Sequence, residues 1–210
     1  MYGRLLADGL LVDGAIKEDL EIRRVVFDSR DVRPGDCFVA IRGGTFDGHM
    51  FIDKAVYNGA IAIVCEATSV YSKDEFSDVA CVHVTNGRKA LLSLVSAFYN
   101  DPGATLTMVG TTGTNGKTTV ATLVTNTLCA LDIPCGFIGT TGYSFGDTQY
   151  PSTATTPAPT DVYQMLFDMQ NHGAKACSME VSSHALDQHR VLVSDFDVAI
   201  FTNLTRDHLD

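Results

Sequence analysis

A glycine-rich segment, Gly113–Thr119 (GTNGKTT), holds the residue types that bind a nucleoside triphosphate. It follows the apolar run Leu106–Val109 and precedes a helix-like stretch, which is where phosphate-binding loops occur. Glycines let several backbone N–H groups converge on one anion, and the following helix adds its positive dipole end. Lys117 would reach the outer phosphates, and the Thr118 hydroxyl is suited to ligate the Mg²⁺ that bridges them. The segment therefore predicts a site for a triphosphate with Mg²⁺.

The glycine spacing is a variant of the strict phosphate-loop pattern. The residue five places before Gly116 is Thr111, and the glycine comes one place earlier, at Gly110. A glycine-rich turn with an incidental lysine is the structural alternative, but the flanking strand and helix favour a phosphate loop. The predicted cofactor contacts are Gly113, Thr114, Asn115, Gly116, Lys117, Thr118 and Thr119.

Three polar clusters follow or precede apolar elements in the same half of the chain. The segment 179–184 ends a strand in Glu180, the segment 202–208 follows another strand and contains His208, and the segment 153–157 is a hydroxyl-rich turn. Taken singly, such residues often cap turns or lie on the surface. Because open α/β sheets hold ligands at the carboxyl ends of their strands, their combination with a phosphate loop favours a site. We predict Lys117, Glu180 and His208 as catalytic residues, and Thr118, Glu180 and His208 as metal ligands.

Composition narrows the classes of partner. The chain has 210 residues, 45% of them apolar, which is ample for a buried core. A formal net charge of −10 with only 15 Lys and Arg argues against nucleic acid, whose binding needs a basic surface, and so favours a small-molecule partner. The N-terminus lacks a signal-peptide pattern and no run of eighteen apolar residues occurs, so no membrane anchoring is indicated. The six cysteines lack C-x-x-C spacing and are interpreted as small buried hydrophobes in a reducing cytoplasm.

Turn residues at 99–103 predict a boundary between two domains, 1–100 and 101–210. In the first we expect strands at 37–41, 60–64 and 80–84, with helices at 51–58, which Gly59 would cap, and 89–98. In the second, nearly apolar strands alternate with helices such as 161–172, with Thr160 capping its start and Gly173 its end. The predicted fold class is α/β, a small N-terminal α/β domain followed by a parallel-sheet domain with the phosphate loop.

These residues resemble the Mur ligases of peptidoglycan synthesis and, among them, the MurE type. The matching motifs are Asp28–Arg30 with Pro34–Ala40, Gly113–Thr119, Thr155–Pro157, Met179–Leu186 with Gln188 and Arg190, and Thr202–Asp210. The resemblance implies an ATP-dependent amide ligase that adds a diamino acid, meso-diaminopimelate or L-lysine, to UDP-N-acetylmuramoyl-L-alanyl-D-glutamate. ATP would phosphorylate the terminal carboxylate, and the incoming amine would then attack the acyl phosphate.

The resemblance also implies roles for individual residues. The N-terminal domain of this chain would hold the UDP end of the substrate with Phe27, Ser29, Gly44, Thr45 and Phe46. The pyrophosphate and muramoyl portion would fall to Thr155, Thr156, Ser182, Gln188 and Arg190. Lys117 and Thr118 with Glu180 and His208 would place ATP and Mg²⁺. A cytoplasmic enzyme that is monomeric at full length and binds neither nucleic acid nor membrane is expected.

Two departures from the family pattern bear on activity. Ala154 stands where an asparagine often precedes Thr-Thr-Pro, so one substrate contact is in doubt. The sequence reaches Asp210 before the lysine that relatives carry as a carbamate and before their C-terminal domain. We therefore expect that these 210 residues alone do not complete ligation.

Other functions remain open at this stage. A MurF-type ligase or a folylpolyglutamate synthetase shares the phosphate loop, but the segments Met179–Leu186 and Asp28–Arg30 respectively disfavour them. A UDP-sugar or nucleotide-binding module without ligase activity is a nonenzymatic alternative. A simple phosphate-loop kinase would leave residues 1–100 unexplained.

Overall fold

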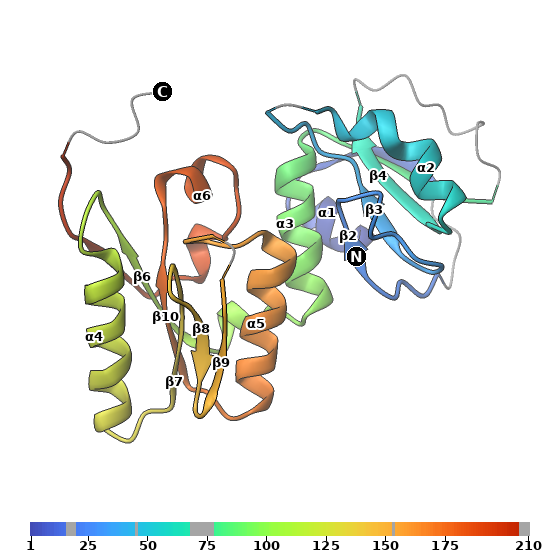
Figure 1. Cartoon of the computed structure of the whole chain (residues 1–210). Helices are drawn as coiled ribbons and strands as arrows, with labels where there is room; N and C mark the ends of the chain where they lie inside the picture. Colours follow the sequence, from blue (N-terminus) through green and yellow to red (C-terminus); the bar gives the residue numbers. More distant parts are fainter. Residues whose placement is uncertain (16–19, 45, 68–77, 153, 206–210) are drawn as a thin grey trace. The chain divides into compact units, whose positions relative to one another are not determined.

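The computed structural model describes residues 1–15, 20–44, 46–67, 78–152 and 154–205. The chain divides into two compact units, Met1–Phe98 and Tyr99–Asp210, coloured blue to green and green to red in Figure 1. The division falls beside the turn residues 99–103. Within the described residues, no helix is both long and apolar enough to cross a membrane.

The first unit is built on a five-stranded sheet in the order β1-β5-β4-β3-β2. The strands are β1 Leu11–Ala15, β2 Val25–Val26, β3 Cys37–Val39, β4 Ala62–Glu66 and β5 Ala80–Val84. Strands β2 to β5 are parallel, and β1 pairs antiparallel with β5. The helices are α1 Tyr2–Ala7, the 3₁₀ turn η1 Gly48–Phe51, α2 Ile52–Tyr57 and α3 Gly87–Phe98.

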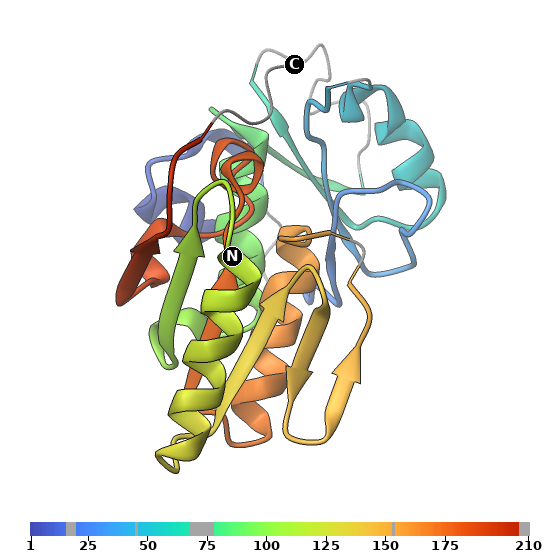
Figure 2. The ribbon, with the colours of Figure 1, turned by 60° about the vertical axis from the view of Figure 1, so that its left-hand side comes forward.

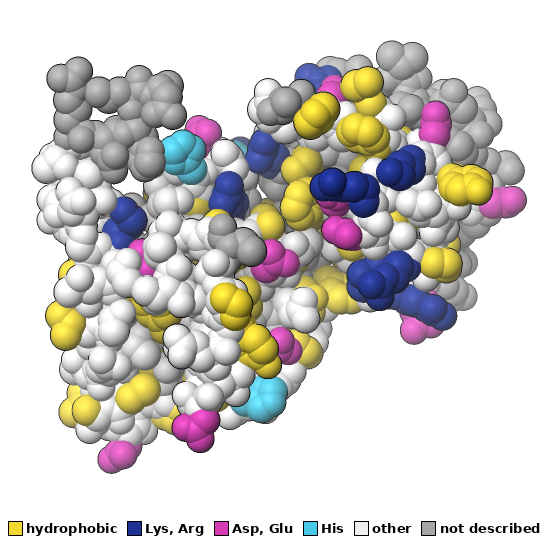
Figure 3. Space-filling view, viewed as in Figure 1, with side chains coloured by type: hydrophobic (Ala, Val, Ile, Leu, Met, Phe, Trp, Pro, Cys, Tyr) yellow, Lys and Arg dark blue, Asp and Glu magenta, His cyan; other side chains and the backbone are white. Residues whose placement is uncertain are grey.

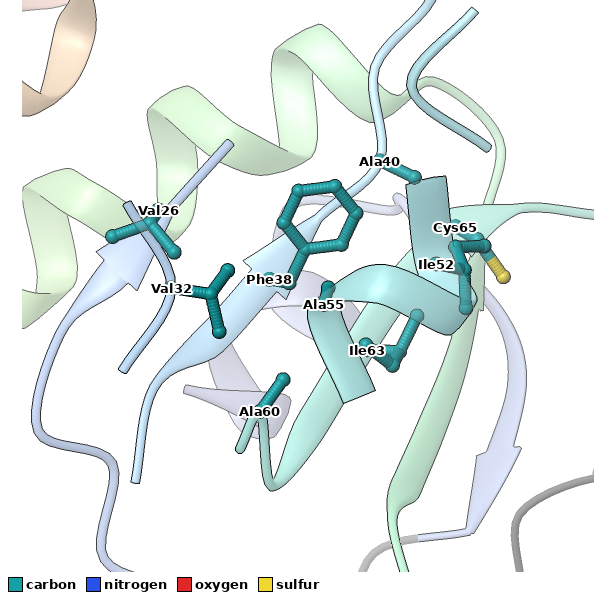
Figure 4. Close-up of a cluster of buried hydrophobic side chains, with 9 residues drawn as sticks. All are labelled: Val26, Val32, Phe38, Ala40, Ile52, Ala55, Ala60, Ile63 and Cys65. Atoms are coloured by element: carbon teal, nitrogen blue, oxygen red, sulfur yellow. The ribbon is translucent and has the colours of Figure 1, made fainter. Parts of the chain in front are cut away.

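An apolar cluster between the sheet and α2 forms one part of the core of this unit. Figure 4 shows Phe38 of β3 at its centre, with Ile52 and Ala55 of α2 and Ile63 of β4 around the ring. The side chain of Phe38 is fully buried. Burial of one such side chain contributes about 1.5–3 kcal/mol, so this cluster supplies much of the unit's stability.

Local hydrogen bonds account for the differences from the expected elements. The strand expected at 60–64 begins two residues later, because Gly59 has a φ of 101° and Ala60 N–H donates to Ala55 O (3.0 Å) to close α2. The helix expected at 51–58 is preceded by η1, whose first turn is capped by Asp47. The strand expected at 80–84 is confirmed as β5.

The second unit is built on a six-stranded sheet in the order β11-β6-β10-β7-β8-β9. The strands are β6 Thr107–Thr112, β7 Cys135–Gly139, β8 Gly142–Phe145, β9 Thr148–Tyr150, β10 Ala176–Glu180 and β11 Val198–Phe201. Strands β11, β6, β10 and β7 are parallel, and β8 and β9 form an antiparallel hairpin. Helices α4 (Lys117–Ala130) and α5 (Pro159–Asn171) lie on opposite faces of the sheet (Figures 1 and 2). The mixed α/β class with parallel sheets is confirmed.

One expectation about this unit is wrong, and one apolar strand is less buried than its neighbours. Helix α5 begins at Pro159 after Ala158, so Thr160 lies inside the first turn and does not cap it, because proline already suits the first helical position. Strand β11 is apolar but only partly covered, because Val198 and Phe201 are 47% and 62% exposed. The reason is its place at the edge of the described sheet, where only β6 pairs with it. Gly173, with a φ of 94°, does end α5 as expected.

All six cysteines are free thiols, and four of them are buried. Burial raises the pKa of the Cys37 thiol to about 12 and that of the Cys135 thiol to about 11, so both stay protonated at neutral pH. The expectation of uniform burial is wrong for Cys129, which is exposed on α4, and Cys81 is half-buried.

Candidate functional site

The turn after β6 has the geometry of a phosphate loop. Gly113 and Gly116 adopt φ values of 130° and 86°, a region that residues with a Cβ rarely occupy. A Cβ on Gly113 would also lie 2.2 Å from Thr202 Oγ1. Gly116 then starts α4 at Lys117, and the N–H groups in the first turn of any helix have no intrahelical partner. The chain thereby brings an electropositive helix end to the carboxyl edge of the sheet.

The Lys117 side chain folds back over this loop. Its Nζ donates hydrogen bonds to Gly113 O (2.7 Å) and Thr114 O (3.0 Å). The ammonium is therefore held beside the loop backbone, which limits the side-chain ordering needed when a phosphate binds.

Glu180 lies at the end of β10 and is 1% exposed. Its Oε2 accepts a hydrogen bond from Thr118 Oγ1 (3.0 Å), and its Oε1 accepts one from the backbone N–H of Thr140 (2.8 Å). Thr140 Oγ1 also lies 3.3 Å from Glu180 Oε2. A buried carboxylate beside a threonine hydroxyl offers the hard oxygen ligands that Mg²⁺ prefers, so these residues fit that ion. The third predicted metal ligand, His208, lies outside the described residues.

The segment after β11 holds the phosphate loop from its other side. Asn203 O accepts from Thr114 N–H (3.0 Å), and Asn203 Oδ1 accepts from Asn115 N–H (3.1 Å). Thr202 Oγ1 donates to Asn115 O (2.7 Å). The amides of Thr114 and Asn115 therefore donate hydrogen bonds within the protein. The N–H groups of residues 116–119 lie at the N-terminal end of α4, where a phosphate is expected to bind.

The hydroxyls of Thr156 and Ser182, which are predicted to contact substrate, make internal hydrogen bonds. Thr156, 1% exposed, donates from Oγ1 to Glu180 O (2.9 Å) and accepts from Ser182 N–H (3.1 Å). Ser182 Oγ caps α6 (Ser183–Asp187) by accepting from Ala185 N–H (3.2 Å). These bonds tie the hydroxyl-rich turn to the end of β10.

Thr155 and Arg190 extend the same network. Thr155 Oγ1 accepts from Thr140 Oγ1 at 3.0 Å. The guanidinium of Arg190 donates through Nη1 to Thr156 O (2.6 Å) and through Nε and Nη2 to Gln188 Oε1 (3.2 and 2.8 Å). The structure therefore brings together all five residues predicted to hold the pyrophosphate and muramoyl portion.

The first unit carries a separate pocket of about 460 Å³. Its lining includes Phe27, Ser29, Phe46, Arg30 and Lys54. Phe46 is 70% exposed, so its ring is accessible for stacking. In the space-filling view of Figure 3, several Lys and Arg side chains appear on the visible face of this unit.

Two other predicted residues belong to the turn beside this pocket. Gly44 follows Gly43, which lines the pocket, and Thr45 lies outside the described residues. The hydrogen bond from Arg30 holds the pKa of the Asp28 carboxyl at the pocket wall below its ordinary value of 3.8. Asp28 is therefore ionised throughout the physiological pH range.

Two family models cover most of the chain. Residues 21–99 match the model for the Mur ligase family, catalytic domain, and residues 111–210 match that for the Mur ligase middle domain. The chain belongs to the Mur ligase family. The phosphate loop and Glu180 lie within the matched middle domain, and the 460 Å³ pocket lies within the first match.

Curated Mur ligases include sequences that are more than 40% identical to this chain. Proteins of Pseudomonas aeruginosa and Caldanaerobacter subterraneus subsp. tengcongensis are 43% and 41% identical over 92% and 91% of this chain. Both are named UDP-N-acetylmuramoyl-L-alanyl-D-glutamate--2,6-diaminopimelate ligase. The chain spans about 40% of the length of these relatives.

Solved Mur ligase structures are similar as well. A UDP-N-acetylmuramoyl-L-alanyl-D-glutamate--2,6-diaminopimelate ligase matches 93% of this chain at a TM-score of 0.75 and 27% identity, with 40% of its own chain covered. The MurF ligase of Thermotoga maritima, solved in complex with ADP, matches 80% of this chain and 34% of its own at a TM-score of 0.50 and 30% identity.

Sequence reasoning missed Thr140 in this candidate site. The residue follows β7 directly, as Glu180 ends β10, so the same strand-end rule would have found it. Its contacts with Glu180 and Thr155 link the predicted metal ligands to the predicted substrate residues. Asn203, in contrast, belonged to a cluster singled out from the sequence, but its clamp on the loop requires the pairing of β11 with β6.

Proposed function

We propose that this chain forms the nucleotide- and substrate-binding part of a ligase that joins 2,6-diaminopimelate to UDP-N-acetylmuramoyl-L-alanyl-D-glutamate with ATP. The observation that carries the proposal is the contact between Thr118, at the start of α4, and the buried carboxylate of Glu180. This contact joins the phosphate loop to a predicted metal ligand, and the curated relatives of the chain bear the name of such a ligase. A cytoplasmic location and small-molecule partners belong to the same proposal.

The loop residues position ATP for phosphoryl transfer. On binding, Lys117 Nζ exchanges its bonds to Gly113 O and Thr114 O for the outer phosphates, while the first turn of α4 donates N–H groups. Mg²⁺ held by Thr118 and Glu180 would neutralise charge on the phosphates. The terminal phosphoryl group passes to the substrate carboxylate and ADP leaves. The amine of the diamino acid then attacks the acyl phosphate, releasing phosphate and a proton.

The remaining predicted residues bind the parts of the substrate that are remote from its reacting carboxylate. Phe27 and Phe46 supply aromatic faces for the uracil ring at the 460 Å³ pocket. Arg190 offers its fork to the anionic pyrophosphate, and Gln188 and Thr156 hold the guanidinium in place until then. Thr156 and Ser182 act as the supports of this arrangement, since their hydroxyls are bonded internally.

Calorimetric titration of the chain tests the binding part of this proposal. We expect UDP-N-acetylmuramoyl-L-alanyl-D-glutamate to bind clearly more tightly than UMP, and Mg-ATP to bind in a separate titration. Lys117→Met should weaken Mg-ATP binding by at least about 10-fold, because it removes a charge that reaches the outer phosphates. Lys175→Met is the matched control, since Lys175 is an exposed lysine at the opposite end of the sheet, just before β10. Equal affinity of both variants for Mg-ATP would contradict the assignment of Lys117.

A MurF-type activity is the second candidate, because the Thermotoga maritima MurF structure also matches this chain. The titration separates the two when it includes the tripeptide product that carries diaminopimelate. Tighter binding of the dipeptide substrate supports the first proposal, and tighter binding of the tripeptide supports the second.

A further inference from the structure

Three side chains with soft ligand atoms meet in the first unit. The ligand atoms of Cys65, Cys81 and His83 all lie within 4.8 Å of one another. They come from the neighbouring parallel strands β4 and β5, whose register pairs Cys65 with His83 and Ile63 with Cys81. Because side chains two residues apart on a strand share a face, and register partners do too, all three project from one face of the sheet.

A fourth residue, Asp13, bonds to the histidine of this cluster. Asp13 is the register partner of His83 across the antiparallel β1–β5 pair, and its Oδ1 lies 2.7 Å from His83 Nδ1. Metal-binding histidines usually donate one ring N–H to a carboxylate, which orients the ring and raises the basicity of the other nitrogen. Because Nδ1 contacts Asp13, Nε2 is the ring nitrogen that His83 would offer to a metal.

Burial and charge favour a divalent ion at this position. Cys65 is fully buried and His83 is 9% exposed, while Cys81 is half-buried. Figure 4 shows the Cys65 sulfur at the rim of the apolar cluster, directed away from Phe38. Two thiolates and a neutral imidazole balance the charge of a divalent cation, so the bound site would carry no net charge into a poorly hydrated environment.

We propose that Cys65, Cys81 and His83 bind Zn²⁺, with Asp13 as the carboxylate that orients His83. Two thiolates and an imidazole are a ligand set typical of this ion, and the partly exposed side of Cys81 leaves the fourth position to water. The ion cross-links β4 and β5 and, through Asp13, β1. The ion therefore stabilises the sheet of the unit that carries the 460 Å³ pocket. This zinc site is distinct from the Mg²⁺ site of the phosphate loop.

Cobalt and zinc titrations of the reduced 210-residue chain test this proposal. We expect Co²⁺, added with excess Mg²⁺ to occupy the oxygen ligands of the phosphate loop, to produce thiolate-to-metal charge-transfer absorption that saturates at one ion per chain. Zn²⁺ should displace it and raise the melting temperature. Cys81→Ser and His83→Gln should remove the absorption, while Cys37→Ala, which alters a buried cysteine in the same sheet, should retain it.

Asp13→Asn provides a readout that does not depend on losing a ligand. The Asp13 side chain is 55% exposed, so the variant should fold, which circular dichroism checks. Loss of the orienting carboxylate should weaken zinc binding about 10- to 100-fold without changing the stoichiometry. Absence of charge-transfer absorption in the wild-type chain would overturn the proposal, and so would unchanged zinc affinity in folded Cys81→Ser, His83→Gln or Asp13→Asn.

Discussion

The chemistry of the second unit depends on how one carboxylate is held. Glu180 is 1% exposed, and burial of a charged group is costly unless hydrogen bonds replace its water. Thr118 and Thr140 supply those bonds from two different segments. A carboxylate fixed in this way keeps its oxygens beside the first turn of α4, which is where a metal bound to ATP phosphates is expected.

Thr140 is predicted to act as a positioning residue. Thr140→Val removes the hydroxyl that contacts Glu180 and Thr155, and we expect it to weaken Mg-ATP binding roughly 10-fold through a mispositioned carboxylate. Thr140→Ser keeps the hydroxyl and should restore affinity to near the wild-type level. Titration of Mg²⁺ at fixed ATP is the decisive measurement, because a purely structural role would lower stability without changing the apparent Mg²⁺ affinity.

The Asp28–Arg30 pair should make folding stability depend on pH only under acidic conditions. The side-chain hydrogen bond from Arg30 lowers the folded-state pKa of Asp28 below its ordinary 3.8, so the pair contributes its stability above that value. This contribution is lost as the pH falls through the folded-state pKa. Asp28→Asn should therefore lose less stability than the wild type between pH 5 and pH 3, and the two should behave alike between pH 7 and pH 5. Urea unfolding at each pH measures the difference.

At the scale of elements, the phosphate loop is positioned by the segments that follow two neighbouring strands. The turn after β6 adopts left-handed backbone at Gly113 and Gly116, and the chain after β11 fixes it through Thr202 and Asn203. The pairing of β11 with β6 brings these segments together although about ninety residues separate them. The loop shape is therefore a property of the sheet as well as of its own glycines.

The two loop glycines should respond differently to the same substitution. Gly116→Ala adds a methyl group with no atom within 4 Å and should cost about 1–2 kcal/mol of stability from its positive φ alone. Gly113→Ala also strains a positive φ, of 130°, and places its Cβ 2.2 Å from Thr202 Oγ1, so its loss should be clearly larger. Chemical denaturation of both variants gives the comparison. A smaller loss for Gly113→Ala would show that Thr202 does not fix the loop.

At the scale of the whole molecule, the chain is two units with a separate core in each. Phe38 is fully buried in the cluster of the first unit, and Leu166 of α5 is 1% exposed in the second. The 460 Å³ pocket lies in the first unit and the phosphate loop in the second. Stability and binding should therefore be assigned unit by unit.

Core truncations test this assignment. Phe38→Ala should destabilise the first unit by about 3–5 kcal/mol, and Leu166→Ala should destabilise the second by about 2–5 kcal/mol. Hydrogen exchange should accelerate mainly in residues 1–98 for the first variant and in 99–205 for the second. Mg-ATP binding should survive Phe38→Ala. Uniform acceleration along the chain in both variants would contradict separate cores.

The sequence alone determined the features that depend on local chemistry. The phosphate loop could be predicted because glycines, a lysine and a threonine at fixed spacing act through the backbone of one turn. The apolar strand and helix patterns likewise predicted the α/β class, and the motifs identified the family. Helix and strand ends shifted where capping bonds, such as that of Ala60 to Ala55, compete with propensity.

Only the tertiary structure decided which polar groups are engaged and which distant residues meet. Thr156 resembles a free substrate ligand in the sequence, yet its hydroxyl bonds to Glu180 O and to the N–H of Ser182, residues that lie far along the chain at the end of β10. Cys65 and His83 lack any metal-binding spacing and become neighbours through the register of β4 with β5. Strand register is set by long-range pairing, and therefore no local pattern records it.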